Sequence, residues 1–314
     1  MPDVPQHLKG RDLLRISGWS GEELKTVLDL ADELKALQRR REEHRLLPGR
    51  AVGMIFQKPS TRTRVSFEVG VAQLGGSPLY LRADDLQLGR GETIKDTANV
   101  LSRYLDAIVI RTFAQADVEE LAEYASVPVV NGLTDEAHPC QALADLMTVR
   151  ERLGRLSGVR IAYLGDGNNV CASLMTASAK LGLRFIAAVP KGYEPADDVV
   201  KIARRAAVQS GGTVELVHDP QQAARGADVL YTDVWTSMGQ DEERSRRLRD
   251  LDGFGIDRDL VARAADDAIV LHCLPAHYGE EITEEVLYAP QSAVWDQAEN
   301  RLHSQKALLA LIVP

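Results

Sequence analysis

The 314-residue sequence has few cysteines: only Cys140, Cys171 and Cys273, which lie far apart in the chain. No C-x-x-C spacing occurs, which argues against a disulfide framework and against a structural zinc site. We therefore expect a protein of a reducing compartment.

Long apolar runs are also missing. No stretch approaches the roughly 18 apolar residues that a membrane span needs. The first residues, Met1–Pro5, show neither the basic start nor the apolar segment of a secretory signal. The sequence predicts a cytoplasmic protein that does not act at a membrane.

An excess of positive charge is lacking too, because 37 Lys and Arg face 46 Asp and Glu for a net charge of −9. Such a chain offers no long-range basic field to nucleic acid or to an anionic membrane. An anionic ligand must be bound by a local cluster, which favours small anionic substrates over polymers.

What the sequence does contain is a regular alternation of apolar strand patterns and helical patterns, in a length typical of two domains of about 150 residues each. Such alternation predicts α/β domains with mainly parallel sheets flanked by helices, the second domain being Rossmann-like. We place the domains at residues 1–150 and 151–296. The expected strands are 51–56, 78–82, 107–111, 127–130, 159–164, 184–189, 213–217, 228–232 and 268–272.

The stretch Lys58–Arg64 follows the first of these strands and precedes a helical pattern with apolar positions at Val65, Val69, Val71 and Leu74. Ser60 or Thr61 is placed to cap that helix. Hydroxyls and guanidinium groups at a helix N-terminus suit a phosphate or carboxylate ligand, because unpaired N–H groups and the helix dipole add to them. A plain surface cap with solvated arginines is the alternative.

Gly165-Asp166-Gly167 follows another strand and opens a helix, which would suggest a dinucleotide-binding turn. The G-x-G-x-x-G pattern fails, however, because Val170 occupies its third glycine position. Asn168 and Asn169 also place amides where a pyrophosphate needs bare backbone. We therefore expect no nicotinamide, and the sequence indicates no other cofactor and no metal.

Further polar stretches fall near expected strand ends, where ligands bind in open α/β sheets. Taken singly they are weak signals: Arg111 reads as a solvated edge residue, His138 as a helix cap and Cys273 as a small buried residue. The stretches include Gln87, Arg111, His138–Gln141, Asn168–Asn169, Asp233–Gly239, His272–Pro275 and Glu299–Arg301.

Together these motifs carry a resemblance that covers essentially the whole chain. Ser60-Thr61-Arg62-Thr63 with His138-Pro139-x-Gln141 resembles the aspartate/ornithine carbamoyltransferases. Asp233-x-Trp235-x-Ser237-Met238-Gly239 and His272-Cys273-Leu274-Pro275 narrow the resemblance to the ornithine branch. The resemblance implies a first domain that binds carbamoyl phosphate, with the C-terminal helix, about 297–314, packed back onto it, and a second domain that binds L-ornithine. It also implies trimers, or multiples of trimers, with active sites between subunits.

Carbamoyl transfer needs a phosphate dianion held, a carbonyl polarised and a neutral amine delivered, so many donors are required near the phosphate. By the resemblance, the phosphate is bound by Ser60, Thr61, Arg62 and Thr63. The carbamoyl group and the bridge to phosphate are held by Arg111, His138, Gln141 and Arg301. Gln87 reaches into the neighbouring subunit's site, and Cys273 and Leu274 also contact carbamoyl phosphate.

For ornithine, the resemblance pairs Asp233 with the α-ammonium, and Asn169, Ser237 and Met238 with the carboxylate end. Cys273 and the carbonyl of Leu274 face the δ-amine, and Cys273 is either the proton acceptor or only a hydrogen-bond partner. Catalysis falls to Arg62, Arg111, His138 and Cys273.

The sequence also bears on other acceptors and other classes of protein. An aspartate enzyme should lack the Ser237-Met238-Gly239 and His272–Pro275 motifs. An enzyme for putrescine or N-acetylornithine should alter the α-amino pocket, yet Asp233 is present. From other classes, a nicotinamide-dependent dehydrogenase and a non-catalytic carbamoyl phosphate-binding subunit remain the alternatives. Cys140 departs from the threonine or aliphatic residue of many relatives and is either an extra thiol beside the pocket or a small buried helix residue.

Overall fold

The structure is a computed structural model that describes residues 2, 4–82, 86–87, 91–236 and 241–314. The chain forms two compact units. Unit 1 comprises residues 1–147 and 299–314, and unit 2 comprises residues 148–298. The chain leaves unit 1 within helix α5 (Pro139–Leu153) and returns to it within helix α12 (Val294–Ile312). Among the described residues, no helix combines the length and apolar character that crossing a bilayer requires.

Unit 1 contains a four-stranded parallel sheet with the order β2 (Ser77–Arg82), β1 (Ala51–Phe56), β3 (Ala107–Arg111) and β4 (Val129–Leu133). The strand order reverses between β1 and β3, whose last residues Phe56 and Arg111 stand side by side. Ligands of open α/β sheets bind at the carboxyl ends of strands where the order reverses. The topology therefore predicts a ligand site at the segments that follow β1 and β3.

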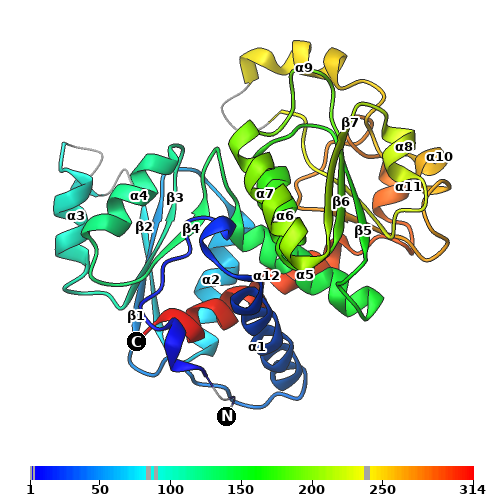
Figure 1. The fold of residues 1–314 in the computed structure, drawn as a ribbon. Coiled ribbons are helices and arrows are strands. Elements are labelled where there is room, and N and C mark those ends of the chain that lie inside the picture. Colours follow the sequence, from blue (N-terminus) through cyan, green and yellow to red (C-terminus); the bar gives the residue numbers. More distant parts are fainter. Residues whose placement is uncertain (1, 3, 83–85, 88–90, 237–240) are drawn as a thin grey trace. The chain divides into compact units, whose positions relative to one another are not determined.

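Helices cover both faces of this sheet (Figure 1). Helix α3 (Ile94–Leu101) packs beside α4 (Gln115–Tyr124), while α1 (Gly21–Arg39) and α2 (Thr61–Gln73) lie on the other side. The N-terminus of α1 is fixed by a capping box, in which the Ser20 hydroxyl accepts from Glu23 N and Glu23 accepts from Ser20 N. Short 3₁₀ turns at Gln6–Leu8 and Ile16–Gly18 precede it.

Helix α2 buries a different stripe from the one its valines predicted. Val71 and Leu74 are buried as expected, but Val65 and Val69 are 49% and 40% exposed. The buried side also contains Phe67 and the small residues Ser66 and Gly70, and a Cβ at Gly70 would lie 3.1 Å from Cγ of Lys306 in α12. Close approach of two helices selects small residues, and these carry no apolar signal in the sequence.

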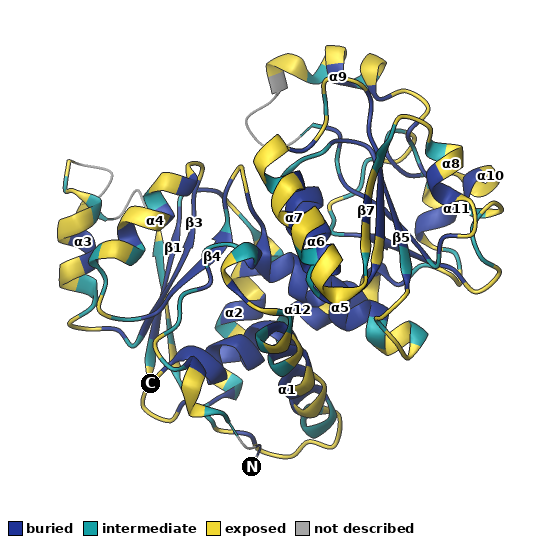
Figure 2. Cartoon of the chain, viewed as in Figure 1, coloured by how far each residue is buried: buried dark blue, intermediate teal, exposed yellow. Residues whose placement is uncertain are grey.

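Helix α12 begins at Val294, earlier than the predicted residue 297, so Arg301 lies inside the helix rather than near its start. Its part in unit 1 is almost entirely buried, as the dark ribbon in Figure 2 shows. The Lys306 ammonium is buried as well and donates to Oε1 of Gln38 at 2.7 Å, Nε2 of His44 at 3.0 Å and Oε1 of Gln73 at 3.0 Å. Lys306 thus joins α12 to α1 and α2.

Unit 2 is built on a five-stranded parallel sheet with the order β7 (Thr213–Val217), β6 (Arg184–Ala188), β5 (Arg160–Leu164), β8 (Val229–Thr232) and β9 (Ile269–His272). Counted from β5, this order is 3-2-1-4-5, which is that of a Rossmann fold. The predicted fold class is confirmed in both units. The order reverses between β5 and β8, where Leu164 pairs with Thr232 at the carboxyl end.

In unit 2, α6 (Asn169–Lys180) and α7 (Asp197–Ser210) cover one face of the sheet. Short helices α8 (Pro220–Ala224), α10 (Arg258–Val261) and α11 (Glu284–Leu287) lie on the other face (Figure 1). Asp241–Glu243 form a 3₁₀ turn that leads into α9 (Arg244–Asp250). These four short helices were not predicted, since four to seven residues do not span enough turns to show a helical period.

Candidate functional site

In unit 1, four predicted site residues meet at the reversal of the strand order. Nη2 of Arg301 donates to Oγ1 of Thr63 at 3.0 Å, and Nη1 of Arg111 reaches the same oxygen at 3.5 Å. Nη1 of Arg301 also donates to Oε1 of Gln141 at 2.7 Å. Arginines from β3 and α12 thus meet at the hydroxyl of Thr63 in α2, and Gln141 of α5 joins the cluster through Arg301.

The N-terminus of α2 lies in this cluster and is capped as predicted. Oγ of Ser60 accepts from the backbone N–H of Thr63 at 3.2 Å. Thr61 and Arg62 occupy the first turn, where backbone N–H groups and the positive end of the helix dipole attract anions. Thr63 is buried, while Thr61 is exposed and Arg62 partly so. The first turn thus presents hydroxyl, amide and guanidinium donors together.

Arg64 does not belong to this set, although it completes the same sequence stretch. Its Nε donates to Oε1 of Glu68 at 3.0 Å, and its guanidinium lies 3.6 Å from the centre of the Tyr80 ring. Lys58 has a different role again, because its buried ammonium pairs with Asp135 and lies 4.1 Å from the centre of the Phe113 ring. Lys58 therefore anchors the loop that leads into α2.

His138 immediately precedes α5 and is buried. Burial lowers the pKa of His138 well below its usual value, and the positive charges of Arg301, Arg111 and Arg62 lower it further. The imidazole is therefore neutral at physiological pH. A neutral ring among arginines can hydrogen-bond a carbonyl or an amide without adding charge.

Two other residues of unit 1 that the sequence analysis singled out, Gln87 and Cys140, make no described hydrogen bond to the arginine cluster. Gln87 is exposed, and the described contacts do not join it to the arginine cluster. Cys140 is fully buried in α5, where its thiol donates to the carbonyl of Asn131 at 3.4 Å, and burial raises its pKa to about 12. This thiol behaves as a small buried helix residue.

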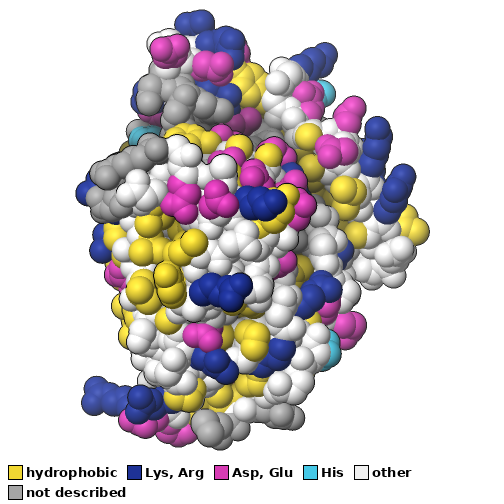
Figure 3. Space-filling view, turned by 90° about the vertical axis from the view of Figure 1, so that its left-hand side faces the viewer, with side chains coloured by type: hydrophobic (Ala, Val, Ile, Leu, Met, Phe, Trp, Pro, Cys, Tyr) yellow, Lys and Arg dark blue, Asp and Glu magenta, His cyan; other side chains and the backbone are white. Residues whose placement is uncertain are grey.

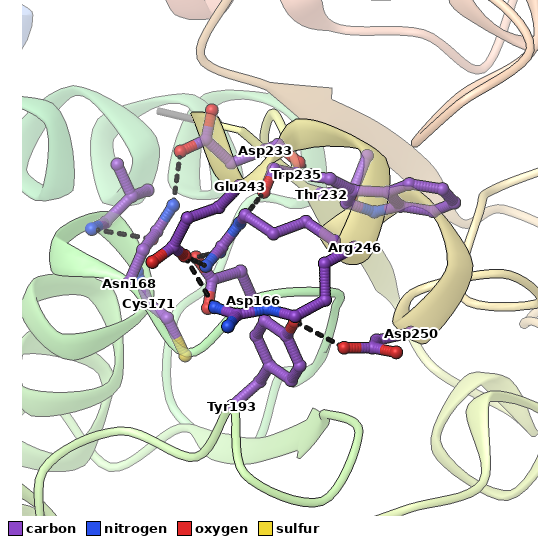
Figure 4. A network of polar contacts seen from close by, with 12 residues as sticks. Asp166, Asn168, Cys171, Tyr193, Thr232, Asp233, Trp235, Glu243, Arg246 and Asp250 are labelled. Carbon is purple, nitrogen blue, oxygen red and sulfur yellow. Dashed lines mark hydrogen bonds and ion pairs between the residues drawn. The ribbon is translucent and has the colours of Figure 1, made fainter. Parts of the chain in front are cut away.

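In unit 2, the corresponding cluster surrounds Asp233, which directly follows β8. One carboxylate oxygen accepts from Nδ2 of Asn168 at 2.8 Å, and the other accepts from the thiol of Cys273 at 2.8 Å. Figure 4 shows the amide of Asn168 turned toward Asp233. The carboxylate thus joins the segments that follow β5, β8 and β9.

Asn168 was not among the predicted ligand-binding residues, whereas its neighbour Asn169 was. Oδ1 of Asn168 caps α6 by accepting from the backbone N–H groups of Val170 and Cys171, and it also accepts from the Tyr163 hydroxyl at 3.1 Å. One amide therefore caps a helix and orients Asp233. The available signal was its place after β5, opposite Asp233 across the strand-order reversal.

The same segment explains why the Gly165-x-Gly167 turn does not form a pyrophosphate cradle. A Cβ at Gly167 would lie 2.4 Å from N of Pro195 and 2.5 Å from O of Tyr193. This glycine makes room for the chain's own loop. Because Asn168 already caps the helix, the arrangement argues against a dinucleotide, in agreement with the failed sequence pattern.

A network that sequence reasoning missed supports the Asp233 segment (Figure 4). Nε of the buried Arg247 donates to the carbonyl of Trp235 at 2.5 Å, its guanidinium pairs with Asp166 and it lies 4.9 Å from the centre of the Tyr193 ring. Burial raises the pKa of Asp166 to about 6, while Arg247 opposes that rise. The partners lie far apart in sequence, so no local pattern links them.

Of the remaining predicted residues, Cys273 and Leu274 follow β9 in unit 2, while Ser237 and Met238 lie outside the described residues. Among the described residues, ligand atoms come within 4.8 Å of one another in two groups, Asp233–His272–Cys273 and His277–Glu280–Glu281. Members of both groups are already bonded: the Cys273 thiol donates to Asp233, and Glu280 pairs with Arg244. A metal would have to displace these contacts.

Two family models match the chain. The description "Aspartate/ornithine carbamoyltransferase, carbamoyl-P binding domain" matches residues 11–151. The description "Aspartate/ornithine carbamoyltransferase, Asp/Orn binding domain" matches residues 157–312. The resemblance inferred from the sequence motifs is thereby confirmed.

Whole-chain relatives agree. The chain is 58% identical over 306 residues to ornithine carbamoyltransferase of Pyrococcus horikoshii, covering 98% of this chain and 96% of the relative. It is 56% identical over 306 residues to the anabolic ornithine carbamoyltransferase of Pyrococcus furiosus, covering 98% and 97%. A solved structure of the Pyrococcus furiosus enzyme matches with a TM-score of 0.95 over 98% of both chains, at 56% identity. With models matching nearly all residues and relatives this similar, the chain belongs to the aspartate/ornithine carbamoyltransferase family.

Proposed function

We propose that the chain is an ornithine carbamoyltransferase. It transfers the carbamoyl group of carbamoyl phosphate to the δ-amine of L-ornithine and releases L-citrulline, phosphate and a proton. The observation that carries this proposal is the pair of clusters at the two strand-order reversals: arginines converging on Thr63, and Asp233 joined to Cys273. The first suits an anion with a carbonyl, and the second an amino acid with two amines.

In unit 1, the proposed ligand is carbamoyl phosphate. Ser60, Thr61, Arg62 and Thr63 bind the phosphate dianion at the N-terminus of α2, where amide and guanidinium donors meet it together. The carbamoyl end is held by Arg111, His138, Gln141 and Arg301. Negative charge grows on the carbonyl oxygen during attack and on the phosphate as it leaves, so preorganised donors stabilise the transition state more than the bound substrate.

In unit 2, the proposed ligand is L-ornithine. The Asp233 carboxylate binds the α-ammonium. In this structure the Cys273 thiol donates to that carboxylate, and the ammonium would replace the thiol as the donor. Asn169, Ser237 and Met238 hold the carboxylate end. An alkylammonium has a pKa near 10.4, so the δ-nitrogen must lose a proton before it attacks. We assign Cys273 as the acceptor of that proton, with the carbonyl of Leu274 orienting the amine.

We also propose that the chain works as a trimer, or a multiple of trimers, in the cytoplasm. Gln87 is exposed, as a residue that serves a neighbouring subunit must be. Val65, Val69 and Leu79 leave apolar surface uncovered on α2 and β2. Figure 3 shows hydrophobic side chains exposed among charged ones on the side of Figure 1 that carries α3. Exposed apolar side chains that gather on one face are a feature of protein–protein interaction surfaces.

The test is an acceptor panel. Purified protein is incubated with carbamoyl phosphate and with ornithine, putrescine, N-acetylornithine or aspartate, and phosphate release is measured against a blank without acceptor. We expect release to be fastest with ornithine, because Asp233 supplies a partner for its α-ammonium. Faster release with putrescine or N-acetylornithine would reassign the acceptor, and no release with any acceptor would contradict catalysis.

A further inference from the structure

Beside Cys273 lies a buried pair that the proposed chemistry does not use. His272 ends β9 and Glu281 lies nine residues later, before α11, and both side chains are completely buried. Nε2 of His272 is 3.0 Å from Oε1 of Glu281. Burying a carboxylate is costly unless hydrogen bonds compensate it. A carboxylate at this buried position therefore indicates a role that depends on its hydrogen bonds, which an apolar side chain could not make.

The other ring nitrogen of His272 touches the backbone of the proposed ornithine site. Nδ1 lies 2.8 Å from the backbone nitrogen of Leu274. Leu274 has a φ of +58°, the left-handed region that side chains other than glycine rarely adopt. Holding a residue there costs on the order of 1 kcal/mol or more and requires surrounding contacts. The bond to His272 is such a contact.

These two contacts determine the tautomer of His272. A backbone N–H can only donate, so Nδ1 must accept, and the ring hydrogen therefore sits on Nε2 and points at Glu281. Oε1 of Glu281 also accepts from the backbone N–H of His277 at 2.6 Å. The backbone N–H of His272 is itself held by Oε1 of Gln297 at 2.9 Å. Glu281 thus ties together both ends of the segment 272–277.

We propose that Glu281 and His272 are positioning residues that hold Leu274 in its left-handed conformation and so aim the Leu274 carbonyl and the Cys273 thiol at the acceptor amine. The inference rests on the proposed function for what these two groups face. The link runs from a buried carboxylate, through one fixed imidazole tautomer, to one backbone N–H. An apolar pair of equal volume would fill the same space but could not bind that N–H.

Glu281→Met tests the link by removing both carboxylate oxygens at similar volume. We expect kcat with ornithine to fall by roughly 10- to 100-fold, as misplacement of reacting groups by about 1 Å typically does. The KM for carbamoyl phosphate should stay within about threefold, because most of its proposed ligands, including the phosphate ligands Ser60–Thr63, belong to unit 1, and only Cys273 and Leu274 belong to the segment that the variant disturbs. Glu281→Gln keeps an acceptor for His272 and should restore most of the turnover.

The matched control is Asp219→Ala. Asp219 caps α8 in unit 2 by accepting from the N–H groups of Gln221 and Gln222, so its loss costs about 1 kcal/mol of stability away from Cys273. This variant should keep normal turnover. Equal turnover in Glu281→Met and Asp219→Ala would overturn the proposal, as would failure of Glu281→Gln to exceed Glu281→Met.

A second readout does not depend on activity. In ¹⁵N-histidine spectra of the wild-type protein, with the His272 signals identified by their loss in His272→Gln, Nε2 should carry the hydrogen and Nδ1 should be bare. Hydrogen exchange at Leu274 should also be faster in Glu281→Met than in Asp219→Ala. A hydrogen on Nδ1, or unchanged exchange, would contradict the link even if the variants lost activity by misfolding. Absence of wild-type turnover with ornithine would instead contradict the proposed function alone.

Discussion

Neighbouring residues of one sequence stretch have separate roles in this structure. Arg62 and Arg64 both lie at the start of α2, yet Arg64 is bound to Glu68 and Tyr80 on the exposed side. Arg62 instead adds to the positive charge around His138. Spacing of two along a helix places side chains about 200° apart, so the two guanidinium groups cannot serve one ligand equally.

This difference gives a paired prediction. Arg62→Ala should lower turnover by at least ~100-fold, because one preorganised donor to the charge that develops in the transition state is lost. Arg64→Ala should change turnover by less than about twofold, as surface substitutions generally do. Steady-state kinetics on both variants, side by side, measure the effect. Equal losses in the two variants would show that the stretch acts as a whole, and a normal Arg62→Ala enzyme would remove Arg62 from the site.

At the scale of elements, α12 connects the anion cluster of unit 1 with helices α1 and α2. It supplies Arg301 to the anion cluster, and a few residues later the buried Lys306 binds Gln38 of α1 and Gln73 of α2. The partners of Lys306 are two glutamine oxygens and one histidine ring nitrogen, so its three donors match three acceptors. A fully satisfied polar cluster fixes how three helices meet, which apolar packing alone does less specifically.

Lys306→Met should therefore destabilise unit 1. Methionine preserves most of the stem's packing but leaves the oxygens of Gln38 and Gln73 and Nε2 of His44 without their donor. We expect the free energy of unfolding to fall by about 1–3 kcal/mol, the cost of leaving polar groups unpaired in a buried or partly buried place. Urea denaturation measures it. Lys25→Met, at an exposed lysine of α1 that pairs with Glu22, is the control and should change stability by less than about 0.5 kcal/mol. An unchanged free energy of unfolding in Lys306→Met would mean that water or rotated amides replace the ammonium as hydrogen-bond partners.

At the scale of the whole molecule, the sheets were predictable and the contacts that assemble the site were not. Strands 51–56 and 107–111 match their predicted bounds, because strands covered on both faces are continuous apolar runs. Strand 213–217 also matches, although it is an edge strand in which apolar and polar residues alternate. Strand β4 lies two to three residues beyond its predicted bounds of 127–130. The bond from Arg301 to Thr63 and the pair of Arg247 with Asp166 join residues far apart in sequence, so only the folded chain reveals them.

The stability of the whole protein should also depend on pH, through the buried His138. Because the folded pKa of His138 lies well below 6.5, the unfolded chain binds a proton that the native state refuses once the pH falls below about 6.5. This contribution to stability is complete above that pH and is lost as the pH falls toward the folded pKa. Lowering the pH from 6.5 to 5.5 should remove roughly 1 kcal/mol through His138 alone.

Urea unfolding at pH 7.5, 6.5 and 5.5 tests this expectation. In His138→Gln the part of the pH dependence that His138 contributes should disappear, and the variant's curve should be flatter by about that 1 kcal/mol. His7→Gln, at an exposed histidine, should keep the wild-type slope. Identical slopes in all three proteins would mean that the native state accepts a proton at His138 after all.

Unit 1 is assembled from two pieces of chain with unit 2 inserted between them, and this has a consequence for synthesis on the ribosome. The core of unit 1 needs Ala307–Val313, all buried, which are translated after the whole of unit 2. At about 5–20 residues per second, residues 1–147 wait roughly 10–30 s for their missing helix. The nascent chain therefore completes its second folding unit first, while the first still exposes the surface that α12 will cover. We expect chaperones to bind the nascent chain mainly during this interval, while that surface is exposed.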